Sequence, residues 1–311
     1  MEFTETEVIE ELRAIFTHTD SRVLVGIGDD AAVVSTPASR IAITTDMAVE
    51  NVHFRRGWAT AEEIGMKITA ANLADIYSMG ATPEHLVVAL ALTGEESMMW
   101  IKELAHGIEK EAQKCDVRII GGDIVRGPAV TISITAFGEV KEPILRSGAS
   151  IGDTIVITNL PGWSAAGLFL LANRVNVSAI HPALAVERAL AQFRAPLVPY
   201  ADAVALKGAH AMSDTSDGLL TQGAQMAAAS RVRFQIEASL LSKHPDFEDL
   251  SALANAVGAD VWDWIGAGGE DHAFLATGHD LPAYEIGVVI AGSGIELLGV
   301  SRTPQGFTHF K

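Results

Sequence analysis

Strand-like runs and helical stretches alternate along this 311-residue chain, and that alternation limits the possible folds more than any other feature of the sequence. Short runs of β-branched or other apolar residues, at 40–45, 86–92 and 130–137, have the composition of strands. Between them, residues 60–79 and 95–114 carry apolar side chains at helical spacing. Both halves of the chain mix the two kinds of segment, so the sequence predicts an α/β or α+β protein.

The length of the chain and a turn-rich segment near its middle predict two domains. A chain of 311 residues is long for one ordinary core. Residues 141–150 (KEPILRSGAS) are rich in turn formers and are interpreted as the linker. We therefore expect an N-terminal domain over residues 1–140 and a C-terminal domain over residues 148–311.

Charge and cysteine content exclude several classes of function. The formal net charge of −17 repels nucleic acid and anionic membranes, so we expect neither as a partner. The single cysteine, Cys115, permits no intrachain disulfide and no cysteine-based zinc site. Residues 1–16 have the pattern of an acidic amphipathic helix and not of a signal peptide, and no apolar run reaches the roughly 18 residues of a membrane span. These features predict a cytoplasmic protein.

Six acidic clusters lie beside glycines or at the predicted ends of strands and helices. Strand ends are where folds commonly place functional groups, and glycine lets a backbone approach a ligand closely. The strand at 40–45, for example, is expected to end at Asp46, and a short strand at 117–120 is expected to end before the glycines at 121–122. The clusters are 26–30 (GIGDD), 44–46 (TTD), 72–75 (NLAD), 121–123 (GGD), 213–218 (SDTSDG) and 268–271 (GGED).

The side chains of these clusters favour a hard cation. Oxygen ligands without a matching set of His or Cys are typical of Mg²⁺ or Mn²⁺ sites. Several separate carboxylates could hold more than one ion, and such ions bridge phosphate oxygens during phosphoryl transfer. Taken singly, each cluster is more commonly a turn or a helix cap. Six clusters in one chain instead favour an enzyme that handles phosphates.

Other candidate motifs point less clearly to a function. The sequence has no Walker A motif and no Gly-x-Ser-x-Gly hydrolase elbow. Residues 162–167 (GWSAAG) are better explained by helix packing than by a phosphate loop. His53 is equally compatible with a structural role and with a role at the acidic turn before it. Arg146 in the linker is either a phosphate contact or an exposed surface arginine.

Together and in order, these motifs resemble those of the thiamine-monophosphate kinase family. That family belongs to a superfamily that includes aminoimidazole ribonucleotide synthetase. The resemblance runs from about residue 26 almost to the C-terminus. The motifs that carry it are GIGDDAA, TTD with NVHF, K-x₄-NLADI with MGATP, GGD, RSGA, SDGL and GGED.

This resemblance implies a fold, a reaction and partners. The fold would have an aminoimidazole ribonucleotide synthetase-like N-terminal domain that binds metal and ATP and pairs with its twin in a homodimer. A C-terminal α/β domain would cover the nucleotide and the substrate. ATP would phosphorylate thiamine monophosphate by direct in-line transfer with several Mg²⁺ ions. Because the acceptor phosphate is already largely ionised at neutral pH, the reaction requires no general base.

By matching positions, the resemblance also implies the roles of individual residues. The metal ligands would be Asp30, Thr44, Thr45, Asp46, Asp75, Asp123, Asp214 and Asp217. The ATP contacts would be Gly122, Asp123, Arg146 and Ser216. The contacts to thiamine phosphate would be His53, Glu270 and the C-terminal aromatic residue Phe307, and the catalytic carboxylates would be Asp46, Asp123 and Asp217.

The chain departs from the family pattern at a few positions. Met47 stands where Thr or Leu is common, and Ile124 stands where Thr is common. His272 and Phe274 replace residues of a usual Tyr-Glu-Leu pattern. Near the C-terminus, residues 306–310 (GFTHF) carry phenylalanine where the larger Trp or Tyr is more usual. None of these changes removes a carboxylate, so we expect the reaction type to be retained.

Two alternatives belong to other functional classes. The first is another ATP-dependent synthetase of the same superfamily. A selenophosphate synthetase would carry a reactive cysteine near its N-terminus, whereas Cys115 lies at a predicted helix end. The second is a nucleotide-binding regulator, which would lack some of the metal carboxylates. All of the implied carboxylates are present in this sequence.

Overall fold

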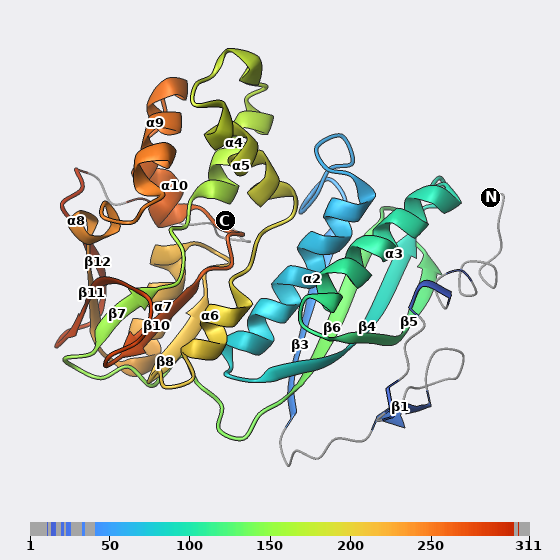
Figure 1. Ribbon diagram of the computed structural model, residues 1–311, viewed down its shortest axis with the longest axis horizontal. Helices are drawn as coiled ribbons and strands as arrows, with labels where there is room; N and C mark the ends of the chain where they lie inside the picture. The colour runs from blue at the N-terminus through green and yellow to red at the C-terminus, as the bar shows by residue number, and fades with distance from the viewer. Residues whose placement is uncertain are drawn as a thin grey trace. The chain divides into compact units, whose positions relative to one another are not determined.

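The computed structural model describes residues 41–301 continuously, together with residues 11, 14–16, 20–21, 23–25, 33–34 and 304. The predicted site residues Asp30 and Phe307, and most of the helix predicted over residues 1–16, lie outside the described residues. The chain forms two compact units, one of residues 1–77 with 81–141 and one of residues 78–80 with 142–311. Each unit combines a sheet with helices, which confirms the prediction of a mixed α/β fold (Figure 1).

The unit formed by residues 1–77 and 81–141 contains a four-stranded sheet of order β3-β6-β4-β5. Only the β4–β5 pair is parallel. A small two-stranded sheet of β1 (Val23–Val25) and β2 (Val33–Val34) precedes it. The larger elements are β3 (Ile41–Val49), α2 (Ala61–Ser78), β4 (Thr82–Leu92), α3 (Met98–Gln113), β5 (Arg118–Arg126) and β6 (Thr131–Glu139).

The two faces of this four-stranded sheet differ in cover. Helices α2 and α3 lie side by side against one face (Figure 1). Residues of β6 alternate accordingly, with Ile132, Ile134 and Ala136 buried and their neighbours half-buried. On the other face, Ile43 of the edge strand is 63% exposed and Met47 is 58% exposed. We call this second side the open face of the sheet.

Two strand ends differ from their predicted positions. β3 continues past Asp46 to Val49, because every residue from Ile41 to Val49 pairs with β6. β5 likewise runs through Gly122 and Asp123 to Arg126, paired in parallel with β4. The predictions that these strands end at the acidic clusters are therefore wrong. Both clusters lie within strands, where alternate side chains point to opposite faces.

The unit that contains residues 142–311 has a six-stranded sheet of order β12-β9-β11-β7-β10-β8. Its neighbouring strands are antiparallel except for β12 and β9. The strands are β7 (Thr154–Ile157), β8 (Ala211–Asp214), β9 (Arg233–Glu237), β10 (Phe274–Gly278), β11 (Tyr284–Ile290) and β12 (Gly294–Leu298). The helices are α4 (Trp163–Ala172), η1 (Val177–Ala179), α5 (Ala183–Arg194), α6 (Tyr200–Ala205), α7 (Leu219–Ser230), α8 (Ala238–Leu241), α9 (Phe247–Val257) and α10 (Val261–Ala267).

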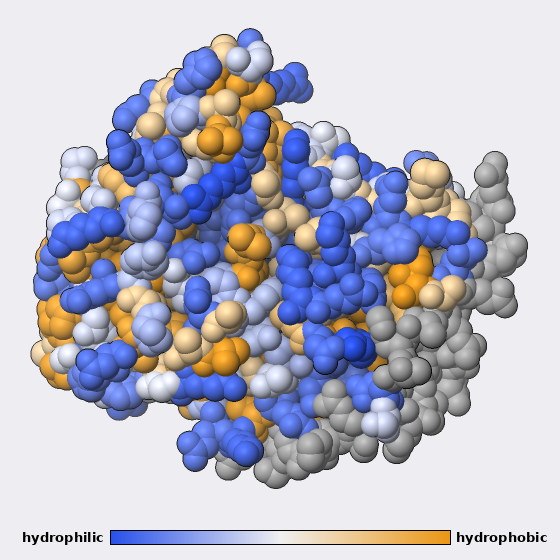
Figure 2. All heavy atoms as spheres, viewed as in Figure 1, coloured by the Kyte–Doolittle hydropathy of each residue, from blue (hydrophilic) through white to orange (hydrophobic). Residues whose placement is uncertain are grey.

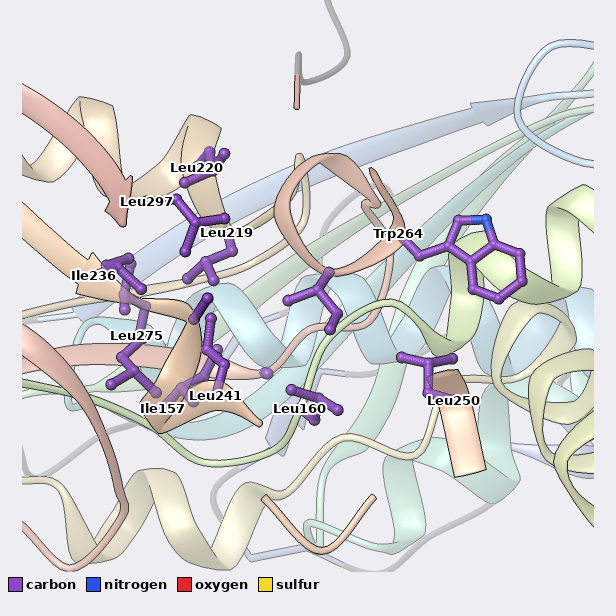
Figure 3. Packing of buried hydrophobic residues seen from close by; sticks show 14 of the residues in the cluster. Ile157, Leu160, Leu219, Leu220, Ile236, Leu241, Leu250, Trp264, Leu275 and Leu297 are labelled. Carbon is purple, nitrogen blue, oxygen red and sulfur yellow. The ribbon is translucent and has the colours of Figure 1, made fainter. Parts of the chain in front are cut away.

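The core of this unit is formed by aliphatic side chains from the sheet and its helices. Figure 3 shows Ile157 and Leu275 from neighbouring strands close to Leu219 of α7. Trp264 of α10 extends the same cluster. Strands β8 and β10 contribute to this core, and the motif segments 213–218 and 268–271 adjoin these two strands. A rigid core therefore supports both motif segments.

The surface and helices agree with the composition. Hydrophilic residues cover much of the face seen in Figure 2, between scattered apolar patches. In the part of the chain that the structure describes, no helix is both long enough and apolar enough to cross a membrane.

Candidate active site

Strand β3 and helix α2 bring three motif residues together. The hydroxyl of Thr44 donates to Oδ2 of Asp75 at 2.7 Å. The backbone N–H of Asp46 donates to Oδ1 of Asn72 at 3.2 Å, and Asn72 is itself held by the carbonyl of Ile68. Asn72 and Asp75 are three residues apart on α2, so one side of the helix presents both to the strand. Thr44, Asp46 and Asp75 therefore share the helix-covered side of the sheet.

Thr45 lies on the opposite side of the sheet from Thr44. Its hydroxyl accepts from Thr135 at 2.9 Å and donates to the carbonyl of Ile134 at 3.0 Å. Both partners belong to β6, and Thr45 is exposed. The alternation of a strand thus divides the sequence cluster 44–46 between two faces.

Asp123 is separated from Asp46 by the width of the sheet. In the strand pairing, Asp123 lies opposite Ala89, which lies opposite Ser133, which in turn lies opposite Met47. Neighbouring strands are about 4.8 Å apart, so the three spacings between β5 and β3 place Asp123 about 14 Å from β3. Residues in one row share a face, so Asp123 is on the open face with Thr45, where it is exposed. Within this sheet the structure does not bring Asp46 and Asp123 together.

Two motif glycines are explained by close backbone approach. A Cβ atom at Gly122 would lie 1.8 Å from the carbonyl oxygen of Val88 on the neighbouring strand. A Cβ atom at Gly269 would lie 2.4 Å from the carbonyl oxygen of Ser216. Only glycine fits at either position without moving backbone. Glycine therefore allows the GGD segment to approach β4 closely, and the GGED segment to approach the SDTSDG loop closely.

His53 lies in the turn that follows β3, and its ring is oriented by the backbone. The N–H of Val49 donates to Nδ1 of His53 at 3.0 Å, while the N–H of His53 donates to the carbonyl of Val49 at 2.9 Å. Because Nδ1 accepts, the neutral ring carries its proton on Nε2. His53 thus supports its own turn through both its ring and its backbone.

In the unit of residues 142–311, two motif loops lie side by side because their strands are neighbours. Asp214 at the end of β8 pairs with Phe274 at the start of β10. Beyond this pair, the N–H of Thr215 donates to the carbonyl of Ala273, and the N–H of Glu270 donates to the carbonyl of Ser216 at 2.7 Å. We call residues 214–218 and 268–273 the paired loops. They bring together four predicted site residues, which are Asp214, Ser216, Asp217 and Glu270.

Within the paired loops, Asp217 and Ser216 differ in what they contact. The carboxylate of Asp217 is half-buried and makes no hydrogen bond or ion pair in the described part of the chain. The hydroxyl of Ser216 accepts from Nε2 of Gln222 at 2.9 Å. Since that bond uses a lone pair of the oxygen, the hydroxyl proton of Ser216 is left to donate elsewhere. Sequence reasoning did not identify Gln222, and no motif marks it.

Asp271 caps helix α4 from a distant part of the sequence. Its two carboxylate oxygens accept from the N–H of Gly162 at 2.6 Å and of Ser164 at 2.9 Å. Burial raises the pKa of Asp271 to about 6, against the opposing effect of the two backbone N–H groups. α4 begins at Trp163, and a Cβ atom at Gly167 would lie 2.2 Å from the carbonyl oxygen of Ala189 on α5, so the interpretation of residues 162–167 by helix packing is confirmed.

His272 is also absent from the predicted site residues. Its Nδ1 lies 2.7 Å from Oδ2 of Asp214, and both side chains are buried. The signal for it in the sequence was its departure from the family pattern after Gly-Glu-Asp.

Arg146 is exposed, and its guanidinium donates to Oε1 of Gln225 on α7 at 3.0 Å. This contact is compatible with both predicted interpretations, a surface arginine and a phosphate contact.

The donor groups present suit a hard cation, although no preformed site is evident. Among the described residues, no group of three or more His, Cys, Asp and Glu side chains is arranged to hold a metal ion. The candidate ligands are nevertheless all oxygen atoms, such as those of Thr44, Asp75 and Asp217. Oxygen donors of this kind fit Mg²⁺.

Comparisons with known proteins agree with the fold and the motifs. The sequence model described as "AIR synthase related protein, N-terminal domain" matches residues 28–140. Thiamine-monophosphate kinase of Mycobacterium tuberculosis is 38% identical over 258 residues, which cover 82% of this chain and 74% of the relative. The crystal structure of thiamine-monophosphate kinase from Stenotrophomonas maltophilia matches with a TM-score of 0.82 and 30% identity, covering 97% of this chain and 99% of that one. The structure of AaThiL complexed with AMPPCP and TMP matches with a TM-score of 0.78 and 27% identity over 98% of this chain and 97% of that one.

The resemblance inferred from the motifs is confirmed by these relatives. The identity to the M. tuberculosis enzyme extends across both structural units, and the match to the S. maltophilia structure covers almost the entire chain. The protein is therefore a kinase, and the chain belongs to the thiamine-monophosphate kinase family.

Proposed function

We propose that the protein phosphorylates thiamine monophosphate with ATP by direct in-line transfer, giving thiamine diphosphate, and that Mg²⁺ is required. Family membership supports the reaction, as does the relative AaThiL, whose structure holds the ATP analogue AMPPCP together with TMP. The observation that carries the proposal in this chain is the pairing of two motif loops, which assembles Asp214, Ser216, Asp217 and Glu270.

Magnesium is proposed because the donor set fits it. Asp217 is a half-buried carboxylate with no hydrogen bond in the described part of the chain, and a cation would compensate its charge. When bound, Mg²⁺ joins phosphate oxygens and neutralises charge that develops in transfer. The proposed ligands are Asp30, Thr44, Thr45, Asp46, Asp75, Asp123, Asp214 and Asp217.

ATP is proposed to contact Gly122, Asp123, Arg146 and Ser216. The hydroxyl proton of Ser216 is directed away from Gln222, so it can donate to a phosphate oxygen. Arg146 is exposed and anchored to α7 by Gln225, which leaves other guanidinium N–H groups for a phosphate. Asp46, Asp123 and Asp217 would supply the catalytic carboxylates.

Thiamine monophosphate is proposed to contact His53, Glu270 and Phe307. His53 donates from Nε2, because its Nδ1 is occupied by the N–H of Val49. That donor would orient the phosphate that accepts the transferred group. The phosphate oxygen is already ionised, so positioning is sufficient and no residue needs to remove a proton.

We also propose that residues 1–140 dimerise through the open face of the four-stranded sheet, while residues 148–311 cover the nucleotide and substrate. Ile41, Ile43 and Met47 are 47%, 63% and 58% exposed on that face. Large exposed apolar side chains grouped on one surface are typical of an interface. Light scattering should give the mass of a dimer for the wild type and of a monomer for Met47→Asp.

The reaction is tested by incubating the protein with ATP, Mg²⁺ and thiamine monophosphate and separating the products by chromatography. We expect thiamine diphosphate and ADP in equal amounts, and no phosphorylation of free thiamine, because the acceptor brings its own phosphate to the site. Comparable turnover of thiamine and thiamine monophosphate would contradict the proposed reaction.

A further inference from the structure

His272 and Asp214 form a buried polar pair between the paired loops. Nδ1 of His272 lies 2.7 Å from Oδ2 of Asp214, and their side chains are 5% and 2% exposed. An ionised carboxylate only accepts, so the ring N–H donates. Because hydrogen bonds to charged groups are stronger than neutral ones, this bond limits how the carboxylate can rotate.

The bond occupies only one of the two carboxylate oxygens. Oδ1 of Asp214 makes no hydrogen bond within the residues that the structure describes. A carboxylate held by one oxygen presents the other in a fixed direction. In metal sites, such partners of a ligand orient it and increase its affinity for the ion.

The backbone around His272 is held in an unusual conformation. His272 has a φ of +52° and Glu270 a φ of +65°, values that residues other than glycine seldom adopt. Each costs about 1 kcal/mol or more, so the surrounding contacts must maintain them. Asp271 between them is fixed to the start of α4, and the N–H of Glu270 is fixed to Ser216. These contacts leave the His272 ring directed at Asp214.

We propose that His272 is a positioning residue that holds Asp214 with one oxygen presented to the metal ion. The inference rests on the proposed function, in which Asp214 is a metal ligand. It also assigns a role to a residue at which this chain departs from the family pattern. Removing the ring donor leaves Asp214 free to rotate, and metal binding weakens while the fold persists.

The test compares substitutions that separate the donor from the backbone and from the volume of the ring. His272→Asn keeps an N–H donor near Nδ1 and suits a positive φ. His272→Gly keeps the positive φ but has no donor, and His272→Phe keeps a ring of similar volume but has no donor. If one of these two fails to fold, the other still reports on the donor.

The chain offers a matched control in a second pair of histidine and buried aspartate. Nδ1 of His210 lies 2.9 Å from Oδ1 of Asp153, whose side chain is fully buried. Neither residue belongs to a motif assigned to metal, ATP or substrate. His210→Phe therefore removes a comparable bond at a position where we expect no effect on metal affinity.

Calorimetry measures binding of Mg²⁺ to each protein in the presence of AMPPCP, with unfolding temperatures recorded in parallel. We expect His272→Gly and His272→Phe to bind Mg²⁺ about 10- to 100-fold more weakly than the wild type. His272→Asn should remain within about threefold of the wild type, as should His210→Phe. The proposal is overturned if His272→Asn binds Mg²⁺ as weakly as the donor-free variants, or if His210→Phe loses as much Mg²⁺ affinity as they do. It is also overturned if the wild type does not bind Mg²⁺. Formation of thiamine diphosphate is scored separately, so a failed reaction with intact Mg²⁺ discrimination would reject only the proposed function.

Discussion

Replacing Asp271 by asparagine tests whether burial or the end of helix α4 controls this carboxyl group. The group is buried and accepts from the N–H groups of Gly162 and Ser164. Burial favours the neutral form, whereas two N–H donors at a helix N-terminus favour the ionised form. Burial dominates, because the pKa of Asp271 rises from its ordinary value of 3.8 to about 6.

The sign and size of the effect on stability follow from these two pKa values. Between pH 3.8 and about 6 the folded protein binds more protons at Asp271 than the unfolded chain does, so stability falls as pH rises through this window. At 1.36 kcal/mol per pKa unit, the free energy of unfolding falls by about 3 kcal/mol in total across this window. Asparagine does not titrate and lacks this loss. Relative to the wild type, we expect the free energy of unfolding of Asp271→Asn to rise by about 2 kcal/mol between pH 4.5 and pH 7.5.

Urea unfolding at fixed ionic strength measures this difference, with tryptophan fluorescence as the signal. Trp163 opens the helix that Asp271 caps, and Trp264 packs in the same core, so both report on this unit. The control is Asp260→Asn, at the exposed N-cap of α10, where the side chain accepts from the N–H of Trp262. Asparagine caps helices as well as aspartate does, so we expect a change of a few tenths of a kcal/mol there. If the free energy of unfolding of Asp271→Asn, relative to the wild type, stays constant or falls as pH rises, burial does not dominate.

Four further substitutions test the assigned site and its scaffold. Asp46→Asn and Asp123→Asn should each lower kcat by about 100- to 1,000-fold, or about 3–4 kcal/mol, without unfolding the protein, and near-normal rates at saturating Mg²⁺ would remove both from the site. His53→Ala should lower kcat/KM for thiamine monophosphate by about 10- to 150-fold and affect the KM for ATP much less, whereas a defect confined to Mg²⁺ dependence would mean that His53 only supports its turn. Gly122→Ala should destabilise the protein by about 1–3 kcal/mol in thermal unfolding, since its Cβ meets the carbonyl of Val88 at 1.8 Å, while Gly121→Ala meets nothing within 4 Å and should be nearly neutral.

The sequence was sufficient to predict the mixed α/β class, because hydrophobic period and β-branched composition are local properties. It was insufficient for strand ends. Asp46 and the glycines at 121–122 disfavour strands on their own, yet β3 and β5 continue through them. Full pairing with β6 and β4 outweighs that local preference. The consequence for the site is large, because a strand directs Thr44 and Thr45 to opposite faces where a turn would have kept them together.

The motif order was sufficient to identify the family, but it could not show what each acidic residue contacts. The GGED segment illustrates why. Its last two residues and the next one face three different partners: Glu270 binds the backbone of Ser216, Asp271 binds the start of α4, and His272 binds Asp214. The alternate positive φ values of Glu270 and His272 turn the chain between these directions. Partners that lie 54 to 109 residues away in sequence are set by the order of strands in the sheet. Asp271, a carboxylate in one of the acidic clusters that the sequence associates with a cation, is therefore a helix cap in the fold. The histidine beside it, His272, replaces the usual Tyr of the family pattern and contacts Asp214, the carboxylate that we assign to the metal.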